Sequence, residues 1–199
     1  MTPTLRLALF LSLALASSEP ALAQTTIGTD QMLQTLSSAA QAAPSGLSGA
    51  LIREAAIQHM KNNPGIPQTW APIGVRLQNL AQINVQIQFA LNSAIIRPVS
   101  YETIGSIADA LHHPILLRYK FVVAGNTDAS GDRAANMKLS QARADAVVKA
   151  LTTTFHVDPR RLEAVGLGEE ALIDPSRPDD PANRRVQIIN IGTYLPGSN

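Results

Sequence analysis

Residues 125–150 read GNTDASGDRAANMKLSQARADAVVKA, and this stretch decides what kind of fold the chain adopts. It overlaps the apolar run LLRYKFVVAG at 116–125, which has the composition of a buried strand that ends at a glycine. A polar loop comes next, and a long segment with apolar residues at helical spacing follows it. A buried strand, a short loop and an amphipathic helix in this order indicate one unit of an α/β domain.

An arginine, Arg143, interrupts the apolar side of that helix. At about 100° per residue counted from Leu139, the apolar residues cover an arc from about −20° to 180°, and Arg143 falls near about 40°. A guanidinium there needs an anion, because a buried charge without a partner costs several kcal/mol. Asp128, in the loop before the helix, could pair with Arg143 directly. Alternatively, the two charges flank a pocket for a ligand that carries both an ammonium and a carboxylate.

The flanking sequence extends this unit to a domain over residues 81–193. INVQIQF at 83–89 alternates apolar and polar residues, as a strand with one buried face does, and SYETIGSIADALHH at 100–113 has helical spacing behind a capping serine, Ser100. Residues 161–165 and 184–192 read as two further strands. The order predicts an α/β sandwich, a βαβαββ arrangement with a mixed sheet and helices on one face.

The residues outside this domain divide into three segments. A basic start, an apolar run of about ten residues and small residues before position 24 predict a cleaved signal peptide at 1–23, and the run is too short for a spanning helix of about 20 residues. Residues 24–80 are rich in Ala, Ser, Gln and Pro and contain one convincing helix, from an N-cap at Ser48 to a stop at Asn62-Asn63-Pro64-Gly65. Residues 194–199 form a tail. We expect no integral membrane span after cleavage.

Composition excludes several classes of function. The formal net charge is +1, with 16 basic residues scattered among 15 acidic ones, so no nucleic-acid partner is expected. The chain has no cysteine, which leaves no disulfide framework and no thiol for a lipid anchor. The glycine-rich run at 166–171 is followed by three prolines where a phosphate-binding helix would run, and the four histidines lack the spacing of a zinc site. We therefore expect no cofactor and no metal.

Several spaced motifs resemble the signature of the OmpA-like peptidoglycan-binding domain. They occur in the order of that family and span about Ile83 to Ile191, over half of the chain. The motifs are Thr127-Asp128, Asn136, Leu139-Ser140-x-x-Arg143-Ala144-x-x-Val147, Gly166-x-Gly168-Glu169 and Asn183-Arg184-Arg185-Val186. The resemblance implies a strand-helix-strand-helix-strand-strand sandwich that binds the peptide stem of the bacterial wall without cutting it.

The resemblance also implies roles for individual residues. Asp128 and Arg143 would hold the amino and carboxyl ends of the diaminopimelate side chain. Thr127 and Asn136 would border the same pocket with polar groups. Either Arg184 or Arg185 would close it, since alternation along a strand places the two on opposite faces. The loop at Ala90 to Asn92 would contribute backbone atoms. The chain departs from the family at Asn126, where a histidine is common, and at Ala90, where an aspartate is common; these departures bear on the strength of binding.

The sequence thus predicts a non-catalytic peptidoglycan-binding protein in the periplasm of a Gram-negative bacterium, peripheral to the outer membrane. Residues 24–80 would address an envelope protein partner, through the helix at 48–61. The alternative is a wall-modifying enzyme in which Asp128 acts as a general base. Catalysis would require a second convergent group, and the sequence offers none at recognisable spacing.

Overall fold

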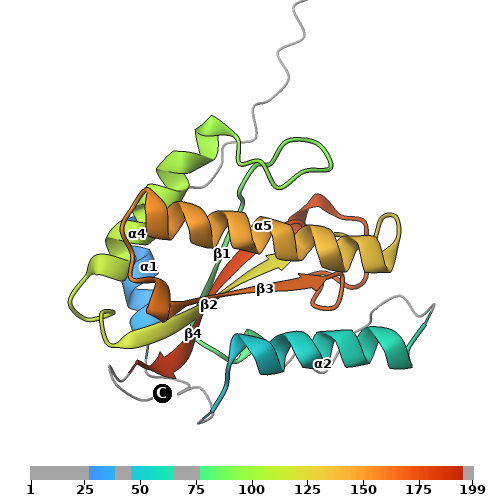
Figure 1. The fold of residues 1–199 in the computed structure, drawn as a ribbon, viewed down its shortest axis with the longest axis horizontal. Helices are drawn as coiled ribbons and strands as arrows, with labels where there is room; N and C mark the ends of the chain where they lie inside the picture. Colours follow the sequence, from blue (N-terminus) through green and yellow to red (C-terminus); the bar gives the residue numbers. More distant parts are fainter. Residues whose placement is uncertain (1–26, 39–45, 65–76, 195–199) are drawn as a thin grey trace, which may run out of the picture.

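The computed structural model describes residues 27–38, 46–64 and 77–194, and it contains a four-stranded mixed sheet (Figure 1). The strands are β1 (Gln82–Val85), β2 (Tyr119–Asn126), β3 (Leu162–Gly168) and β4 (Val186–Thr193), in the spatial order β1-β4-β2-β3. Strand β4 is antiparallel to both β1 and β2, and β3 is parallel to β2. The three strands β1, β2 and β3 therefore run in one direction, and β4 runs against them. The predicted α/β sandwich is confirmed.

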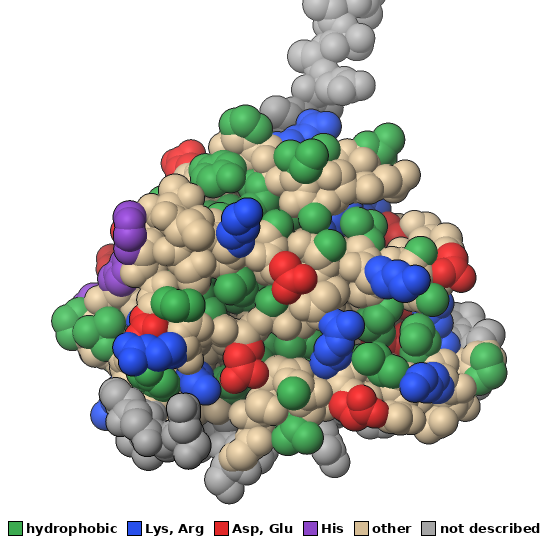
Figure 2. All heavy atoms as spheres, in the orientation of Figure 1, with side chains coloured by type: hydrophobic (Ala, Val, Ile, Leu, Met, Phe, Trp, Pro, Cys, Tyr) green, Lys and Arg blue, Asp and Glu red, His purple; other side chains and the backbone are tan. Residues whose placement is uncertain are grey.

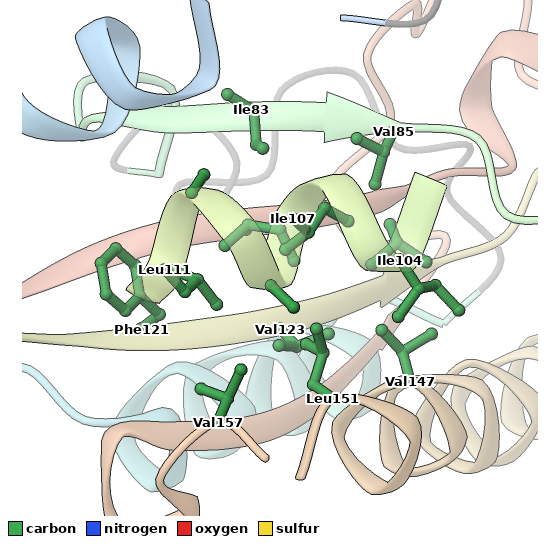
Figure 3. Packing of buried hydrophobic residues seen from close by; sticks show 14 of the residues in the cluster. Ile83, Val85, Ile104, Ile107, Leu111, Phe121, Val123, Val147, Leu151 and Val157 are labelled. Atoms are coloured by element: carbon green, nitrogen blue, oxygen red, sulfur yellow. The ribbon is translucent and has the colours of Figure 1, made fainter. Parts of the chain in front are cut away.

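Two helices cover one face of the sheet, α4 (Tyr101–His112) and α5 (Arg133–Thr153). Side chains of α4 at helical spacing point towards β2 and α5, where they form the main core (Figure 3). The alternation along β2 sends Phe121 and Val123 into this core and Val122 and Ala124 to the opposite face. Three short 3₁₀ turns, Pro98–Ser100, Pro159–Arg161 and Pro181–Asn183, complete the connections.

The helix predicted at 48–61 is present as α2 (Gly49–Asn62), and Ser48 caps it by accepting a bond from the Leu51 amide at 3.3 Å. This helix lies on the face of the sheet opposite to α5 (Figure 1), where Ile52 and Ala56 pack in a second core with residues of β2, β3 and β4. The apolar side of α2 is thus already covered by its own chain. A protein partner would have to use its other side, where Leu51 is 58% exposed.

A second helix of the N-terminal region, α1 (Thr29–Ser37), packs against α4 and β1. Its Met32 and Leu36 are fully buried in the main core. Both described helices of residues 24–80 therefore contribute to the core of the domain. The division at residue 80 remains a prediction. The predicted signal peptide, the proline-rich linker around residues 65–76 and all but the first residue of the predicted tail lie outside the described residues.

Helix α5 lies unusually close to the sheet, because glycines face it. A Cβ atom at Gly125 would lie 2.3 Å from the Ser140 carbonyl oxygen, and one at Gly166 would lie 2.3 Å from the Gln141 amide nitrogen. The buried Ser140 hydroxyl accepts a bond from the Gly168 amide at 2.8 Å. Asp132 caps the start of the helix through a 2.7 Å bond from the Ala135 amide. These contacts fix the height and rotation of α5 over the ends of β2 and β3.

A buried carboxylate, Glu170, joins α2 to the start of α5. Its side chain is fully buried and accepts two bonds from Arg133, at 2.6 and 2.7 Å, and a third contact from His59 Nδ1 at 2.8 Å. Arg133 also donates to the Asn63 carbonyl at the end of α2, at 2.6 Å. Both carboxylate oxygens of Glu170 are bonded to Arg133 in a bidentate pair. The cluster therefore joins three segments that are distant in sequence: the end of α2, the start of α5 and the turn after β3.

We expect Glu170→Gln to lower the free energy of unfolding by about 3 kcal/mol, because it removes the hydrogen-bonded counter-charge of the largely buried Arg133 guanidinium. Urea denaturation of the full chain measures this change. The matched control is Lys120→Gln, which removes a surface ion pair with Glu163 and should cost under about 1 kcal/mol. Equal effects of the two substitutions would contradict the structural role of the buried cluster.

Candidate functional site

The topology brings four connections together at one edge of the sheet. The ends of the parallel strands β1, β2 and β3 meet there, and the chain enters β4 at the same edge. Between these connections lies an open cavity of about 570 Å³. Connections after parallel strands are where α/β sheets place ligands, so the cavity is the candidate site. It is lined by Gln86, Ile87, Gln88, Phe89, Ala90, Leu91, Asn92, Arg97, Thr127, Asp128, Ser130, Asn136, Leu139, Arg143, Pro181 and Arg184.

One wall of the cavity is the segment after β1, residues 86–97. The alternating pattern predicts a first strand that continues to Phe89, but β1 ends at Val85, where its partner β4 begins at Val186. The chain then folds back on itself: Phe89 pairs with Ile96, and the Arg97 amide donates to the Gln88 carbonyl at 2.8 Å. Asn92 at the tip has a φ of 48°, a left-handed conformation that asparagine tolerates.

The serine predicted to cap α4 instead holds this wall. Ser100 makes no capping bond, and its buried hydroxyl accepts a bond from the Gln88 amide at 2.8 Å. The capping prediction was therefore wrong. The reason is that the 3₁₀ turn at Pro98–Ser100 places Ser100 in a helical conformation, outside the extended geometry that an N-cap needs.

Asp128 lies after β2 and is bonded on both carboxylate oxygens. Arg184 pairs with Oδ2 at 2.5 Å, and the Ser130 hydroxyl and amide both donate to Oδ1, the amide at 3.2 Å. Burial raises the pKa of Asp128, but the hydrogen bonds from Ser130 and Arg184 outweigh burial and hold the pKa below its ordinary value of 3.8. Asp128 is therefore a carboxylate at neutral pH, with lone pairs left for a further donor.

Arg143 lines the same cavity from α5 but does not pair with Asp128. Its Nε donates to the Ser93 carbonyl at 3.1 Å, and its guanidinium lies 5.0 Å from the centre of the Phe89 ring. Burial and the charge of Arg184 lower the pKa of Arg143, while the charge of Asp128 raises it. No described residue bonds to the two terminal nitrogens. The direct ion pair considered above is thus absent among the described residues, and the two charges face a common space.

Arg143 is accommodated because the N-terminal half of the apolar arc of α5 faces the cavity and not the core. Leu139 and Arg143, one turn apart, both line the cavity, whereas Val147 and Leu151 further along the same side enter the core. The arc is therefore continuous along the helix, but its environment changes from cavity to core. Arg143, whose position looks unfavourable in the sequence, therefore lies in the wall of an open cavity.

Two predicted polar residues border the cavity next to Asp128. Asn136 donates from its amide to the carbonyls of Asp128 and Ser130, at 3.3 and 3.0 Å, and to Glu169 at 2.8 Å, so it shapes the loop. Thr127 is 3% exposed, and its hydroxyl has no bonding partner among the described residues. Buried hydroxyls in folded proteins are normally bonded, and this one lies unpaired by any described residue beneath the surface of the cavity wall.

The structure distinguishes the two consecutive arginines before β4. Arg184 lines the cavity and holds Asp128. Arg185 is 6% exposed and donates to Asn84, Asn183 and Ala171, at 3.1, 3.3 and 2.7 Å. Burial lowers its pKa to about 10. Of the two arginines predicted as alternatives for closing the pocket, Arg184 is the one that lines the cavity, whereas the guanidinium of Arg185 is bonded to structural groups.

Several residues at this cavity were not predicted from the sequence. Ser130, Ser93 and Arg97 lie in irregular segments, where no periodicity distinguishes one polar residue from another. Phe89 was interpreted as part of a strand face and instead stacks on Arg143. A signal existed only for Ser130, since a serine two residues after an aspartate often bonds back to it in a turn. Asn92, which the sequence predicts to contribute backbone atoms to the site, lines the cavity.

Residues 27–38, 46–64 and 77–194 contain no candidate metal centre and no membrane-spanning helix. Acidic and basic side chains are interspersed on the face shown in Figure 2, without a large area of one sign. Within these ranges there is no group of three metal-ligating side chains. Likewise, no helix in the described part of the chain combines the length and apolarity needed to cross a bilayer.

A mixed sheet with a charged cavity at its strand ends defines the class as an α/β domain with a candidate ligand cavity. Residues 88–185 match the family described as OmpA family, so the chain carries an OmpA family domain. Outer membrane porin F of Pseudomonas fluorescens is 32% identical over 111 residues, which covers 54% of this chain and 33% of that protein. The probable lipoprotein YiaD of Escherichia coli (strain K12) is 36% identical over 105 residues, covering 51% and 46%.

Among solved structures, the peptidoglycan-associated lipoprotein from Burkholderia pseudomallei superposes with a TM-score of 0.43 and 28% identity. That match covers 52% of this chain and 87% of the other. The chain spans a third to a half of the length of the two curated relatives described above.

The bonds to Asp128 predict its titration. The lowered pKa means that ionised Asp128 stabilises the fold fully above pH 3.8, and this contribution is lost as pH falls through the folded-state pKa. Ser130→Ala removes one of the bonds and should move the pKa of Asp128 upward, measured by a carboxyl-carbon NMR titration. Ser176→Ala, which removes the equivalent bond to Asp174, is the control and should leave Asp128 unchanged. An unshifted pKa in Ser130→Ala would contradict the assigned hydrogen bond.

Proposed function

We propose that this protein binds peptidoglycan without cutting it, through the free zwitterionic end of diaminopimelate in the stem peptide. The observation that carries the proposal is the arrangement of Asp128 and Arg143, a carboxylate and a guanidinium that face one cavity without pairing with each other. A ligand that bears both an ammonium and a carboxylate on one carbon complements such a cavity. The OmpA family domain and the motif resemblance support the wall as the source of that ligand.

Each side chain has a defined role in this proposal. The terminal nitrogens of Arg143 offer a planar fork to the ligand carboxylate, and the Phe89 ring and the Ser93 carbonyl hold the fork in place. Asp128 accepts the ligand ammonium through lone pairs that Arg184 and Ser130 leave free. Thr127 borders the same cavity. Because the protein groups are held before binding, little ordering entropy is lost.

The charge state of Asp128 supports binding rather than catalysis. A general base works best with a pKa near the operating pH, whereas the pKa of Asp128 is lowered below 3.8. Burial raises the pKa of Glu169, which makes it the more suitable proton carrier, but Glu169 does not line the cavity and bonds to Asn136 instead. The alternative of a wall-modifying enzyme with Asp128 as its base therefore has no favourable observation.

The proposed setting is the periplasm of a Gram-negative bacterium, next to the outer membrane. The relatives named as an outer membrane porin and a probable lipoprotein support an envelope location. An envelope partner, if residues 24–80 recruit one, would contact the exposed side of α2 around Leu51, because the opposite side packs on the sheet. In this arrangement the protein would connect the wall to that partner.

Co-sedimentation with isolated sacculi tests the proposal. Asp128→Ala and Arg143→Met should each weaken binding at least about thirtyfold, since each leaves one ligand charge without its partner. Methionine keeps an apolar stem against Phe89, so Arg143→Met should retain the melting temperature of the unmodified chain. Lys149→Ala, on the exposed side of the same helix, is the matched control and should bind normally.

Two outcomes of that experiment would count against the proposal. If the substitutions lower the melting temperature and leave binding intact, the charges serve the fold and not the ligand. If intact protein releases soluble muropeptides from the sacculi, the protein is an enzyme. The expected result is sedimentation of the unmodified chain with no released fragments.

A further inference from the structure

The charges around the cavity exceed what one zwitterion can balance. Arg97, Arg143 and Arg184 line it, and Asp128 is the one acidic side chain among the described lining residues. Asp128 already pairs with Arg184. A zwitterionic ligand end is neutral overall, and its carboxylate would engage Arg143. This leaves a positive charge on Arg97 without a counterpart, either in the described part of the protein or in that part of the ligand.

The position of Arg97 is fixed although its side chain is exposed. Its amide donates to Gln88 at 2.8 Å, the neighbouring Ile96 pairs with Phe89, and Gln88 is held in turn by the buried Ser100 hydroxyl. These bonds place the start of the Arg97 side chain at the rim of the same wall that supports Arg143. No described carboxylate forms an ion pair with Arg97, so its guanidinium is free to meet an anion at the rim of the cavity.

We infer that Arg97 is a second anion subsite, which holds another carboxylate of the ligand next to the one on Arg143. This inference rests on the proposed function. A stem peptide of L-alanine, γ-linked D-glutamate and diaminopimelate carries such groups, namely the glutamate α-carboxylate and the carboxylate at the end of the peptide. Either one, held by Arg97, would make the site select peptides with free carboxyl groups over amidated ones.

Titration calorimetry of the full chain with three synthetic tripeptides tests this subsite. One peptide has both carboxyl groups free, a second is amidated at the glutamate α-carboxyl, and a third is amidated at the C-terminal carboxyl; all three keep the free zwitterionic end. The unmodified protein should bind one of the amidated peptides about fivefold more weakly, as expected for an exposed ion pair. The peptide that loses affinity identifies which carboxylate Arg97 holds.

Arg97→Gln should remove that preference and bind the free and amidated peptides equally. Arg118→Gln is the matched control, because it makes the same charge change just before the first residue of β2, at the opposite end of that strand from Asp128, and should retain the preference. The inference is overturned if the unmodified protein does not distinguish the peptides, or if Arg97→Gln still does. If the unmodified protein binds none of the three, the proposed function itself fails, and this subsite with it.

Discussion

The ion pair between Asp128 and Arg184 determines which charged groups remain unpaired at the cavity. Arg184, at the entrance to β4, pairs with this carboxylate across the sheet edge, and Ser130 bonds its other oxygen. Arg143 is left facing the cavity with its terminal nitrogens unbonded by any described residue. Had Asp128 and Arg143 paired directly, both charges would have been satisfied within the protein. The observed pairing keeps a carboxylate and a guanidinium available in one space, at the cost of a partly desolvated arginine, and such a cost is typical of sites built for a charged ligand.

Much of the fold could be predicted from local pattern. Alternation in 83–89, the apolar residues of the later strands and helical spacing in the segments between them indicated the correct order of elements, because each element buries apolar side chains. The surface against which α2 packs could not be predicted. Its spacing showed that one side is buried but contained no information about the surface that covers it, and the structure assigns it to the second face of the sheet. The end of β1 at Val85 depends on where β4 begins, which is a long-range property.

Part of the candidate site could be predicted because the charge of one residue conflicts with the apolar residues around it on the helix. Arg143 stood out because a charge within an apolar arc is visible in the sequence, and the structure explains the conflict as a change from core to cavity along one side of α5. Strand alternation indicated that only one of Arg184 and Arg185 faces the cavity, but the choice depends on the pairing of β4, which the local sequence does not encode. Arg97 lay outside any pattern, since its position results from the backbone bonds of an irregular wall.

The most direct test of this account is a crystal structure of the full chain with a diaminopimelate-containing stem peptide. The account predicts the ligand carboxylate on the terminal nitrogens of Arg143 and the ligand ammonium within hydrogen-bond distance of Asp128, with the Asp128 to Arg184 pair preserved. A peptide bound elsewhere, or a cavity closed by direct contact between Asp128 and Arg143, would contradict it.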